Sequence, residues 1–507
     1  MRDMDNVLYY GDNLPVMRQH LADEVVDLAY LDPPFNSNAA YNAFFDEKDG
    51  SRSEAQLHAF KDTWVWDEAA AQCFQDVVEA GGAVAVAMTA FRKLLSESPM
   101  MAYLSMMAPR LVELRRVLKP SGSIYLHCDP TASHYLKILM DAVFGPINFR
   151  NEIIWHYSGW NKKLIARFES RTDMLLFYGK GHPHQQTFHS YARPWASVEE
   201  YVRTRKQKVR TDESGRSYVL SDAGSGKRVH RYLDEAMATG AYTDNVWEID
   251  KLNNSSRERL GYPTQKPEAL LERIILASSN EGGLVLDPFC GCGTTVAVSQ
   301  RLNRQWIGID ITHAAMTLMK DRLFRTFGDQ AKYKVVGEPT SLPDARALAA
   351  SDPYQFQWWA LGLLGARPTD EKKGADRGID GRLFFHDEPI GGETKEIILS
   401  VKAGHASVSH LRDLGHVVDR EGAVIGVLIT MQEPTQPMKT EAAGAGFYVH
   451  RITGQRYPQL QIMTVEDLLA KRLIDRPYAS FPTATFKAAP AAKRKRAEQH
   501  SMPLDEE

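Results

Sequence analysis

The sequence has few cysteines, no long apolar run and almost no net charge. Four cysteines among 507 residues are too few and too scattered for a disulfide framework. They are Cys73, Cys128, Cys290 and Cys292, and no His or Cys pair at zinc-finger spacing follows the last two. No apolar run is long enough to span a membrane, and the first residues lack the layout of a signal peptide. We therefore expect a cytoplasmic protein with no membrane partner.

The low net charge limits how the chain can bind nucleic acid. A formal charge of −3 excludes attraction through the charge of the whole molecule. Local basic patches remain at residues 203–210 and 491–499. Each patch alone is more often a solvated face or a tail than a binding site, so neither assigns a function.

What is present is an alternation of strands and helices, which predicts an α/β fold. Residues 6–32 read as strand, helix, strand, and residues 283–310 repeat this order. Such β-α-β units favour a parallel sheet. Residues 47–119 read mostly as helices, whereas residues 182–256 are polar and have no sustained period, which is typical of a functional segment.

The length of the chain predicts more than one domain. We expect a domain over residues 1–335, a linker near 335–345 and a second, smaller α/β domain over 346–475. Residues 482–507 are rich in Ala, Pro and Lys, a composition that predicts a disordered basic tail.

A glycine-rich turn, LDPFCGCGTT, lies between a predicted strand and a predicted helix. Gly291 and Gly293 occupy the place where doubly wound sheets bind nucleotides. Val296 stands where a third glycine would complete a dinucleotide fingerprint, and no Gly-Lys-Ser/Thr follows, so a phosphate ligand is disfavoured. Asp310 ends the next strand, where it can accept hydrogen bonds from ribose hydroxyls. Ribose without pyrophosphate indicates S-adenosylmethionine, although a lone Gly-x-Gly would more often be a structural turn.

Two further motifs complete a resemblance to a known family. Asp32 to Phe35 read DPPF, Phe289 to Gly293 read FCGCG, and Pro263 to Pro267 read PTQKP. Over residues 5–330 the chain resembles the amino-methylating DNA methyltransferases, which modify adenine N6 or cytosine N4, and these stretches resemble their motifs IV, I and X. Motif IV precedes motif I, as in the permuted β class.

The resemblance implies a Rossmann-like S-adenosylmethionine-dependent methyltransferase fold with circularly permuted motif order. Residues 283–289 would form its first strand and residues 6–12 its third, with a target-recognition region at about 182–256. The implied catalytic residues are Asp32, Pro33, Pro34 and Phe35. The implied cofactor-binding residues are Asp12, Thr264, Lys266, Pro267, Asp287, Pro288, Phe289, Gly291, Gly293, Thr294 and Asp310.

The DPPF residue types suit the implied chemistry. The lone pair of an exocyclic amino nitrogen is delocalised into the base, so the nitrogen is a poor nucleophile. If the Asp32 carboxylate and the Pro33 carbonyl each accept one N–H, the lone pair turns toward the methyl donor. Phe35 can stack on a base flipped out of double-stranded DNA. The alternative interpretation of DPPF is a turn that only ends the strand, because Asp and Pro favour turns in general.

The motifs predict the family more closely than they predict which base is methylated or whether the protein is an active enzyme. Adenine N6 is favoured because motif IV begins with Asp rather than the Ser common in cytosine-N4 enzymes, and cytosine N4 is the alternative. A non-enzymatic alternative is a DNA-binding module that has lost turnover. Neither the recognition sequence nor the oligomeric state can be read from the chain, so a homodimer and a separate restriction partner both stay open.

The C-terminal region resembles the Mrr-like PD-(D/E)xK restriction endonucleases. Asp380 and Lys402 match the residues that hold magnesium and an attacking water in that family. Ser400 stands where the family carries Glu or Gln, with Asp376 and Glu396 as weak substitutes. The sequence therefore leaves open a combined restriction-modification enzyme, a domain that binds DNA without cutting, and a plain α/β accessory domain.

Overall fold

The computed structural model describes residues 6–34, 40–46, 52–61, 64–159, 166, 168–222, 224, 227–253, 256–262, 264–369, 378–386 and 394–477. The largest unit is a nine-stranded sheet in the order β13-β6-β7-β5-β2-β14-β15-β1-β16. In that order its strands are β13 (Val246–Glu248), β6 (Phe149–His156), β7 (Thr172–Gly179), β5 (Leu118–Cys128), β2 (Val26–Leu31), β14 (Leu284–Asp287), β15 (Gln305–Asp310), β1 (Asn6–Tyr10) and β16 (Tyr333–Val336).

The sheet joins the two halves that the sequence separates. β14 pairs in parallel with β2, with Val285 opposite Leu28, and with β15 on its other side. β1 follows β15, so β14 and β1 hold the first and third positions that the permuted order predicts. β7 is antiparallel to both β5 and β6. The prediction that both β-α-β units belong to one sheet is confirmed.

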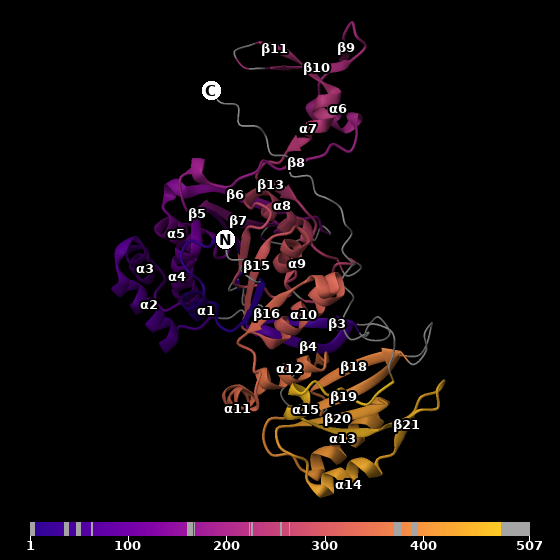
Figure 1. Cartoon of the computed structure of the whole chain (residues 1–507). Helices are drawn as coiled ribbons and strands as arrows, with labels where there is room; N and C mark the ends of the chain where they lie inside the picture. The colour runs from indigo at the N-terminus through magenta and orange to yellow at the C-terminus, as the bar shows by residue number, and fades with distance from the viewer. Residues whose placement is uncertain are drawn as a thin grey trace.

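Helices cover both faces of this sheet (Figure 1). One face carries α1 (Asn13–His20), α4 (Pro99–Val117) and α5 (Ser133–Phe144), and the other carries α8 (Glu268–Ser278), α9 (Thr294–Arg301) and α10 (His313–Phe327). On β2, Ala29 and Leu31 face the first layer, whereas Leu28 and Tyr30 face the second. All four are buried, as expected for a central parallel strand.

The structure adds detail to two expectations about the organisation of the chain. Residues 47–119 are mostly helical, as expected, with α2 (Glu68–Ala80), α3 (Gly82–Leu95) and α4, but they also contain β4 (Arg52–Lys61), which forms an antiparallel hairpin with β3 (Ala40–Asp46). The helix-forming residues of β4 are thus overridden by strand pairing. The expected linker is shorter, because β16 extends to Val336 and α11 (Leu342–Ser351) begins soon after.

Residues 182–256 contain a small folded unit at the edge of the sheet. Its elements are η2 (Pro183–Gln185), β8 (Ala192–Arg193), α6 (Val198–Arg205), β9 (Arg210–Thr211), β10 (Ser217–Asp222), β11 (Arg228–Tyr232), α7 (Leu233–Thr239) and β12 (Ala241–Tyr242). Trp195, Tyr201 and Val219 form the centre of its own core. Figure 1 shows β9, β10 and β11 projecting beyond the edge of the large sheet, to which the chain returns at β13, paired with β6.

The C-terminal region contains a separate five-stranded sheet in the order β17-β18-β19-β20-β23. These strands are β17 (Arg367–Pro368), β18 (Gly381–His386), β19 (Thr394–Lys402), β20 (Ile425–Thr430) and β23 (Leu460–Thr464). The helices are α12 (Pro353–Leu363), α13 (Val408–Glu421), α14 (Gln436–Gly444) and α15 (Val465–Leu469), and β21 (Phe447–Val449) pairs with β22 (Arg456–Pro458). Two buried clusters line its two faces, one around Phe356 and one around Leu414. The expected second, smaller α/β unit is present.

Helix α12 attaches this region to α10 of the large unit. The Gln355 side chain accepts a hydrogen bond from the His313 backbone N–H at 3.1 Å. Gly362 lies so close to Thr317 that a Cβ atom would approach its Oγ1 to 2.3 Å. The two regions therefore share a tight helix–helix contact. Among the described residues, no helix is both long and apolar enough to cross a bilayer.

Candidate active site

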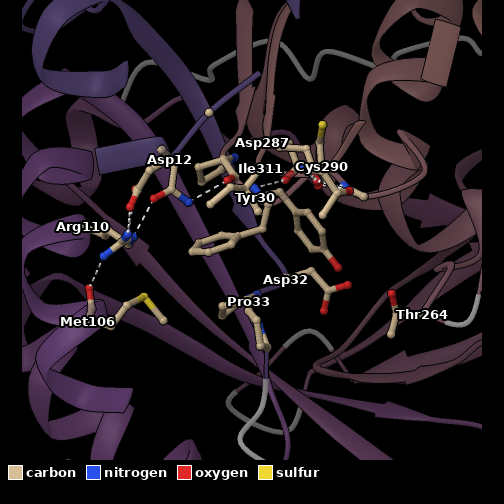
Figure 2. Close-up of a pocket in the computed structure, with 18 of the residues that line it drawn as sticks. Asp12, Tyr30, Asp32, Pro33, Met106, Arg110, Thr264, Asp287, Cys290 and Ile311 are labelled. Carbon is tan, nitrogen blue, oxygen red and sulfur yellow. Dashed lines mark hydrogen bonds and ion pairs between the residues drawn. The ribbon is translucent and has the colours of Figure 1, made fainter. Parts of the chain in front are cut away.

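A cavity of about 660 Å³ lies at the carboxyl ends of the central strands. Asp32 follows β2, Asp287 ends β14, Asp310 ends β15, and Asp12 follows β1 by two residues. Because the carboxyl ends of parallel strands meet at one edge of a sheet, these four carboxylates from distant parts of the chain line one cavity. Figure 2 shows Asp12, Asp32 and Asp287 around it.

The glycine turn is held tightly against the end of β15. Gly291 and Gly293 have φ values of +50° and +73°, a left-handed conformation that glycine adopts at little cost. A Cβ atom at Gly293 would lie 2.7 Å from the Cγ of Met319. The Gly291 N–H donates to the Asp310 carboxylate at 2.9 Å. The turn thus lies between β14 and α9, as the sequence predicts, and packs closely against Met319 of α10.

Asp310 organises the end of β15. One carboxylate oxygen accepts hydrogen bonds from the Thr312 N–H and hydroxyl, both at 2.9 Å, and the other accepts the Gly291 N–H. A carboxylate has about four acceptor sites, so a site remains for a ligand hydroxyl. Burial raises the pKa of Asp310 from its ordinary value.

The cavity has an acidic, desolvated floor that suits a cationic ligand. Burial, with the charges of Asp32 and Asp310 adding to it, raises the pKa of Asp287 to about 7. The Asp287 carboxylate accepts the Phe289 N–H at 3.0 Å. S-adenosylmethionine carries a sulfonium and an ammonium group, and a cavity of this size is typical of small-molecule sites. The residues present therefore fit this cofactor.

Asp12 is anchored by a residue that sequence reasoning missed. Its carboxylate accepts the Leu14 N–H at 2.8 Å, which caps α1, and pairs with the Arg110 guanidinium at 2.7 and 2.8 Å. Arg110 also donates to Asn13 at 2.6 Å and to the Met106 carbonyl at 2.8 Å (Figure 2). Arg110 lies inside a predicted helix, and no motif marks it in the sequence.

Asp32 is clamped between a lysine and a histidine. The Lys266 ammonium donates to its Oδ2, and the Nδ1 of His127 lies 3.2 Å from its Oδ1. Burial raises the pKa of Asp32, but the charges of Lys266 and His127 lower it more, so the net shift is downward. Lys266 also donates to the Thr264 carbonyl at 3.2 Å. Lys266, assigned to the cofactor from the sequence, thus lies directly on the proposed catalytic carboxylate.

His127 belongs to a further group that sequence reasoning missed. Its Nε2 lies 3.6 Å from the Asp173 carboxylate, which the Lys251 ammonium approaches to 3.2 Å. Burial raises the pKa of Asp173, but His127 and Lys251 lower it to about 2. A signal was present, because His127 interrupts the apolar strand SIYLHCD of β5.

Most of the remaining predicted residues line the same cavity. They are Pro33, Pro34, Thr264, Lys266, Pro288, Phe289, Gly291 and Thr294. Pro267 and Gly293 do not line it and instead cap α8 and α9. Phe35 and Pro263 lie outside the described residues.

The predicted metal residues of the C-terminal region have other partners. The Asp380 carboxylate accepts the Val401 N–H at 2.5 Å and the Ser400 hydroxyl at 3.1 Å, and the Lys402 ammonium lies 3.9 Å away. Glu396, four residues before Ser400 on β19, pairs with Arg382. Asp376 lies outside the described residues. Within the described part of the chain, no three His, Cys, Asp or Glu side chains group as a metal site would require.

Comparison with known families agrees with this geometry. Residues 26–321, more than half of the chain, match the family of N6 and N4 amino-methyltransferases described as DNA methylase. The chain belongs to this DNA methylase family. This match confirms the predicted family and fold, and the family is one that depends on S-adenosylmethionine.

Three curated relatives resemble this DNA methylase. Type II methyltransferase M.HpaI of Haemophilus parainfluenzae is 34% identical over 225 residues, which cover 44% of this chain and 60% of that protein. Type II methyltransferase M.EcaI of Enterobacter cloacae is 30% identical over 358 residues, covering 62% and 69%. DNA adenine methyltransferase YhdJ of Escherichia coli K12 is 31% identical over 201 residues, covering 40% and 60%. The chain thus spans about 60% to 69% of the length of these relatives.

The C-terminal part of the chain matches a second family. Residues 353–470 match the family described as NACHT-associated inactive Restriction Endonuclease 1. The predicted restriction-endonuclease-like region is therefore confirmed.

Proposed function

We propose that this chain transfers a methyl group from S-adenosylmethionine to the exocyclic amino group of a base flipped out of double-stranded DNA, with adenine N6 as the favoured target. The observation that carries the proposal is the neighbouring position of β2 and β14. Their ends place Asp32 and Pro33 in the same cavity as the glycine turn and Asp310. An amine acceptor and a cofactor cradle thus share one site.

The cofactor would be held by the turn and by the carboxylates beside it. Asp310 would accept hydrogen bonds from ribose hydroxyls, and Gly291 would give the cofactor close access to the backbone. Asp287 and the acidic floor would favour its positive charge. When bound, S-adenosylmethionine supplies a methyl group activated by the sulfonium.

Asp32 and Pro33 would prepare the amine. Each accepts one N–H, which draws the nitrogen lone pair out of conjugation and aims it at the methyl group. The lowered pKa of Asp32 keeps this carboxylate ionised at neutral pH, so it is an acceptor and can take the proton that the nitrogen loses after transfer. Lys266 and His127 leave acceptor sites on the carboxylate for the amine.

Two observations favour adenine over cytosine. Motif IV begins with Asp32 rather than Ser. One relative is named a DNA adenine methyltransferase. Cytosine N4 is the alternative, because the same two acceptors suit either amine.

A direct assay tests the reaction and the base together. The purified full chain is incubated with methyl-labelled S-adenosylmethionine and unmodified plasmid DNA, and the DNA is digested to nucleosides for mass spectrometry. We expect N6-methyladenine. N4-methylcytosine would overturn the adenine assignment, and cofactor binding without any methylated base would overturn the reaction.

We further propose that residues 353–470 bind DNA without cutting it, rather than holding a catalytic magnesium at Asp380 and Lys402. Ser400 supplies no carboxylate, and Asp380 is already bonded to β19 through the Val401 N–H. The inactive character stated for the matching family supports this choice. Nicking of supercoiled plasmid by the full chain with magnesium or manganese, abolished by Lys402→Ala, would overturn it.

The domain bounds and partners are part of the same proposal. We place the methyltransferase domain at 1–335, its target-recognition region at about 182–256 and the restriction-endonuclease-like domain at 346–475; the predicted tail, 482–507, lies outside the described residues. The basic side chains of residues 203–210 are exposed, which supports a DNA contact there. A homodimer or a separate restriction partner remains a prediction that analytical ultracentrifugation and co-purification would test.

A further inference from the structure

A buried histidine lies between the proposed catalytic carboxylate and a second carboxylate. His127, in β5, is 0% exposed. Its Nδ1 lies 3.2 Å from the Oδ1 of Asp32, and its Nε2 lies 3.6 Å from the Oδ2 of Asp173. An ionised carboxylate only accepts hydrogen bonds, and the shorter of the two contacts, 3.2 Å against 3.6 Å, assigns hydrogen to Nδ1, the ring nitrogen that faces Asp32. The ring is therefore a donor to the carboxylate that the reaction uses.

The surroundings fix the ring in this orientation. The Tyr30 hydroxyl lies 3.3 Å from Nδ1, and the Trp155 ring meets the imidazole edge-on at 5.5 Å between centroids. On the far side, Lys251 pairs with Asp173 at 3.2 Å and lies 3.7 Å above the Tyr157 ring. Asp173 is thus held between two basic side chains.

The contacts form a continuous line from the cavity to the target-recognition region. Asp32 follows β2, His127 is in β5, Asp173 is in β7, and Lys251 follows β13. β13, near the end of residues 182–256, is the strand that returns the chain to the large sheet after the small unit that ends at β12. The catalytic carboxylate is therefore supported from the same edge that carries the proposed DNA-reading unit.

We propose that His127 is a positioning residue for methyl transfer. Its N–H holds the Asp32 carboxylate in the rotation that leaves an acceptor site facing the target amine, and Asp173 with Lys251 holds the imidazole. His127 acts through Asp32 and touches neither base nor cofactor. The inference rests on the proposed function, because it assigns His127 a role in that reaction.

Two amide variants distinguish the contact of His127 with Asp32 from its contact with Asp173. In His127→Asn the amide nitrogen falls near the position of Nδ1, so a donor to Asp32 is kept. In His127→Gln the amide nitrogen falls near Nε2, so the donor faces Asp173 and Asp32 loses its partner. His127→Phe keeps an aromatic ring and removes both ring nitrogens.

The measurement is single-turnover methyl transfer to unmodified plasmid DNA, with S-adenosylmethionine affinity measured by calorimetry on the same preparations. A hydrogen bond to a charged group corresponds to a rate factor of about 10- to 100-fold. We expect His127→Gln and His127→Phe to lose that factor and His127→Asn to retain most of the rate. All three should bind the cofactor with unchanged affinity, because His127 does not line the cavity.

The outcomes distinguish the inference from the proposed function. Equal rates in the Asn and Gln variants, at any level, would overturn the positioning role. If the substitutions weaken cofactor binding as well, Asp173→Asn provides a milder probe, expected to slow transfer several-fold without changing that binding. An unchanged rate there would also count against the role. A wild type that binds the cofactor but transfers no methyl group would overturn the proposed function itself.

Discussion

Lys266 and Asp32 form an ion pair between segments 234 residues apart in the chain. An ammonium N–H on this carboxylate resembles the amine N–H that the proposed reaction would place there. Lys266 therefore does two things at once: it keeps Asp32 ionised, and it uses part of the acceptor capacity that the base requires. A target base that enters the site must therefore bind Asp32 while Lys266 stays paired with it.

Removal of the carboxylate should separate chemistry from cofactor binding. Asp32→Ala is expected to abolish methyl transfer while S-adenosylmethionine binds with nearly normal affinity, because Asp32 orients the amine and the cofactor is held mainly by the turn. Asp32→Asn is the matched variant, which keeps the size of the side chain but not its charge. Near-normal turnover in Asp32→Ala would show that the DPPF assignment is wrong.

Removal of the lysine charge should change the pH dependence. The pKa of Asp32 is raised by burial and lowered more by Lys266 and His127, so its carboxylate contributes stability above the unfolded value and loses it as pH falls through the lower folded value. Lys266→Met removes the charge that lowers the pKa of Asp32 most. The pKa of Asp32 then rises, and the acid limb of the rate profile moves to higher pH. Lys251→Met, which alters the Asp173 pair instead, is the control; an acid limb that moves equally in both variants would contradict this account.

Asp287 should make the cofactor-free protein less stable as pH rises. Its pKa is about 7 in the folded state, against an ordinary value of 3.8. The folded state binds this proton more tightly, so stability falls between those two values, by roughly 4 kcal/mol at about 1.36 kcal/mol per unit. Asp287→Asn should remove most of this decline in denaturant titrations at pH 4 and pH 8. The surface variant Asp329→Asn should retain it. A decline of equal size in both variants would assign the effect elsewhere.

Asp310 should contribute directly to cofactor affinity. Asp310→Ala removes an acceptor for the ribose hydroxyls and releases the Gly291 N–H, and we expect a loss of ~1.5–3 kcal/mol, as for hydrogen bonds to a charged group. Thr312→Val leaves the Asp310 carboxylate in place and removes the hydroxyl that donates to it and caps α10, so it should cost less cofactor affinity. Calorimetry of S-adenosylmethionine binding measures both. Equal affinity in Asp310→Ala and wild type would refute the ribose contact.

Two glycines with the same backbone conformation separate strain from crowding. Gly282 and Gly293 both have a φ of +73°, but a Cβ atom would meet nothing within 4 Å at Gly282 and would lie 2.7 Å from Met319 at Gly293. Gly282→Ala should cost roughly 1–2 kcal/mol of unfolding free energy for the left-handed backbone. Gly293→Ala should add roughly 1–3 kcal/mol from overpacking. Equal losses in denaturant unfolding would mean that Met319 moves aside freely.

The central sheet was predictable because its signals are local and strong. Continuous apolar runs such as residues 26–31 indicate buried parallel strands. The acidic residue at the end of each run indicates that these ends meet at one edge of the sheet. The motif order then assigned both β-α-β units to one sheet, and the structure shows that β14 and β2 are the neighbours where the two units meet. The β3–β4 hairpin was not predictable in the same way, because the residues of β4 favour a helix and only pairing with β3 makes them a strand.

The residues of the candidate site likewise fall into a group that the sequence predicts and a group that it does not. The carboxylates at strand ends and the glycine turn have a fixed relation to elements that the sequence reveals. The support of Asp32 by His127, Asp173 and Lys251 depends on the order of β2, β5 and β7 in the sheet, and on the return of the chain through β13. These partners are far apart in sequence and carry no motif of their own, so geometry alone reveals them.

The position of β14 between β2 and β15 affects how the protein is made. A ribosome synthesises β2 and β5, which pair with each other, long before it reaches β14. β2, the strand that precedes Asp32, therefore keeps an open edge for much of translation, and β1 has neither of its neighbours until β15 and β16 are synthesised. Open strand edges invite incorrect pairing. The centre of the sheet thus closes only after β14 and β15 have been synthesised. The halves that carry Asp32 and Asp310 therefore reach their final structure together.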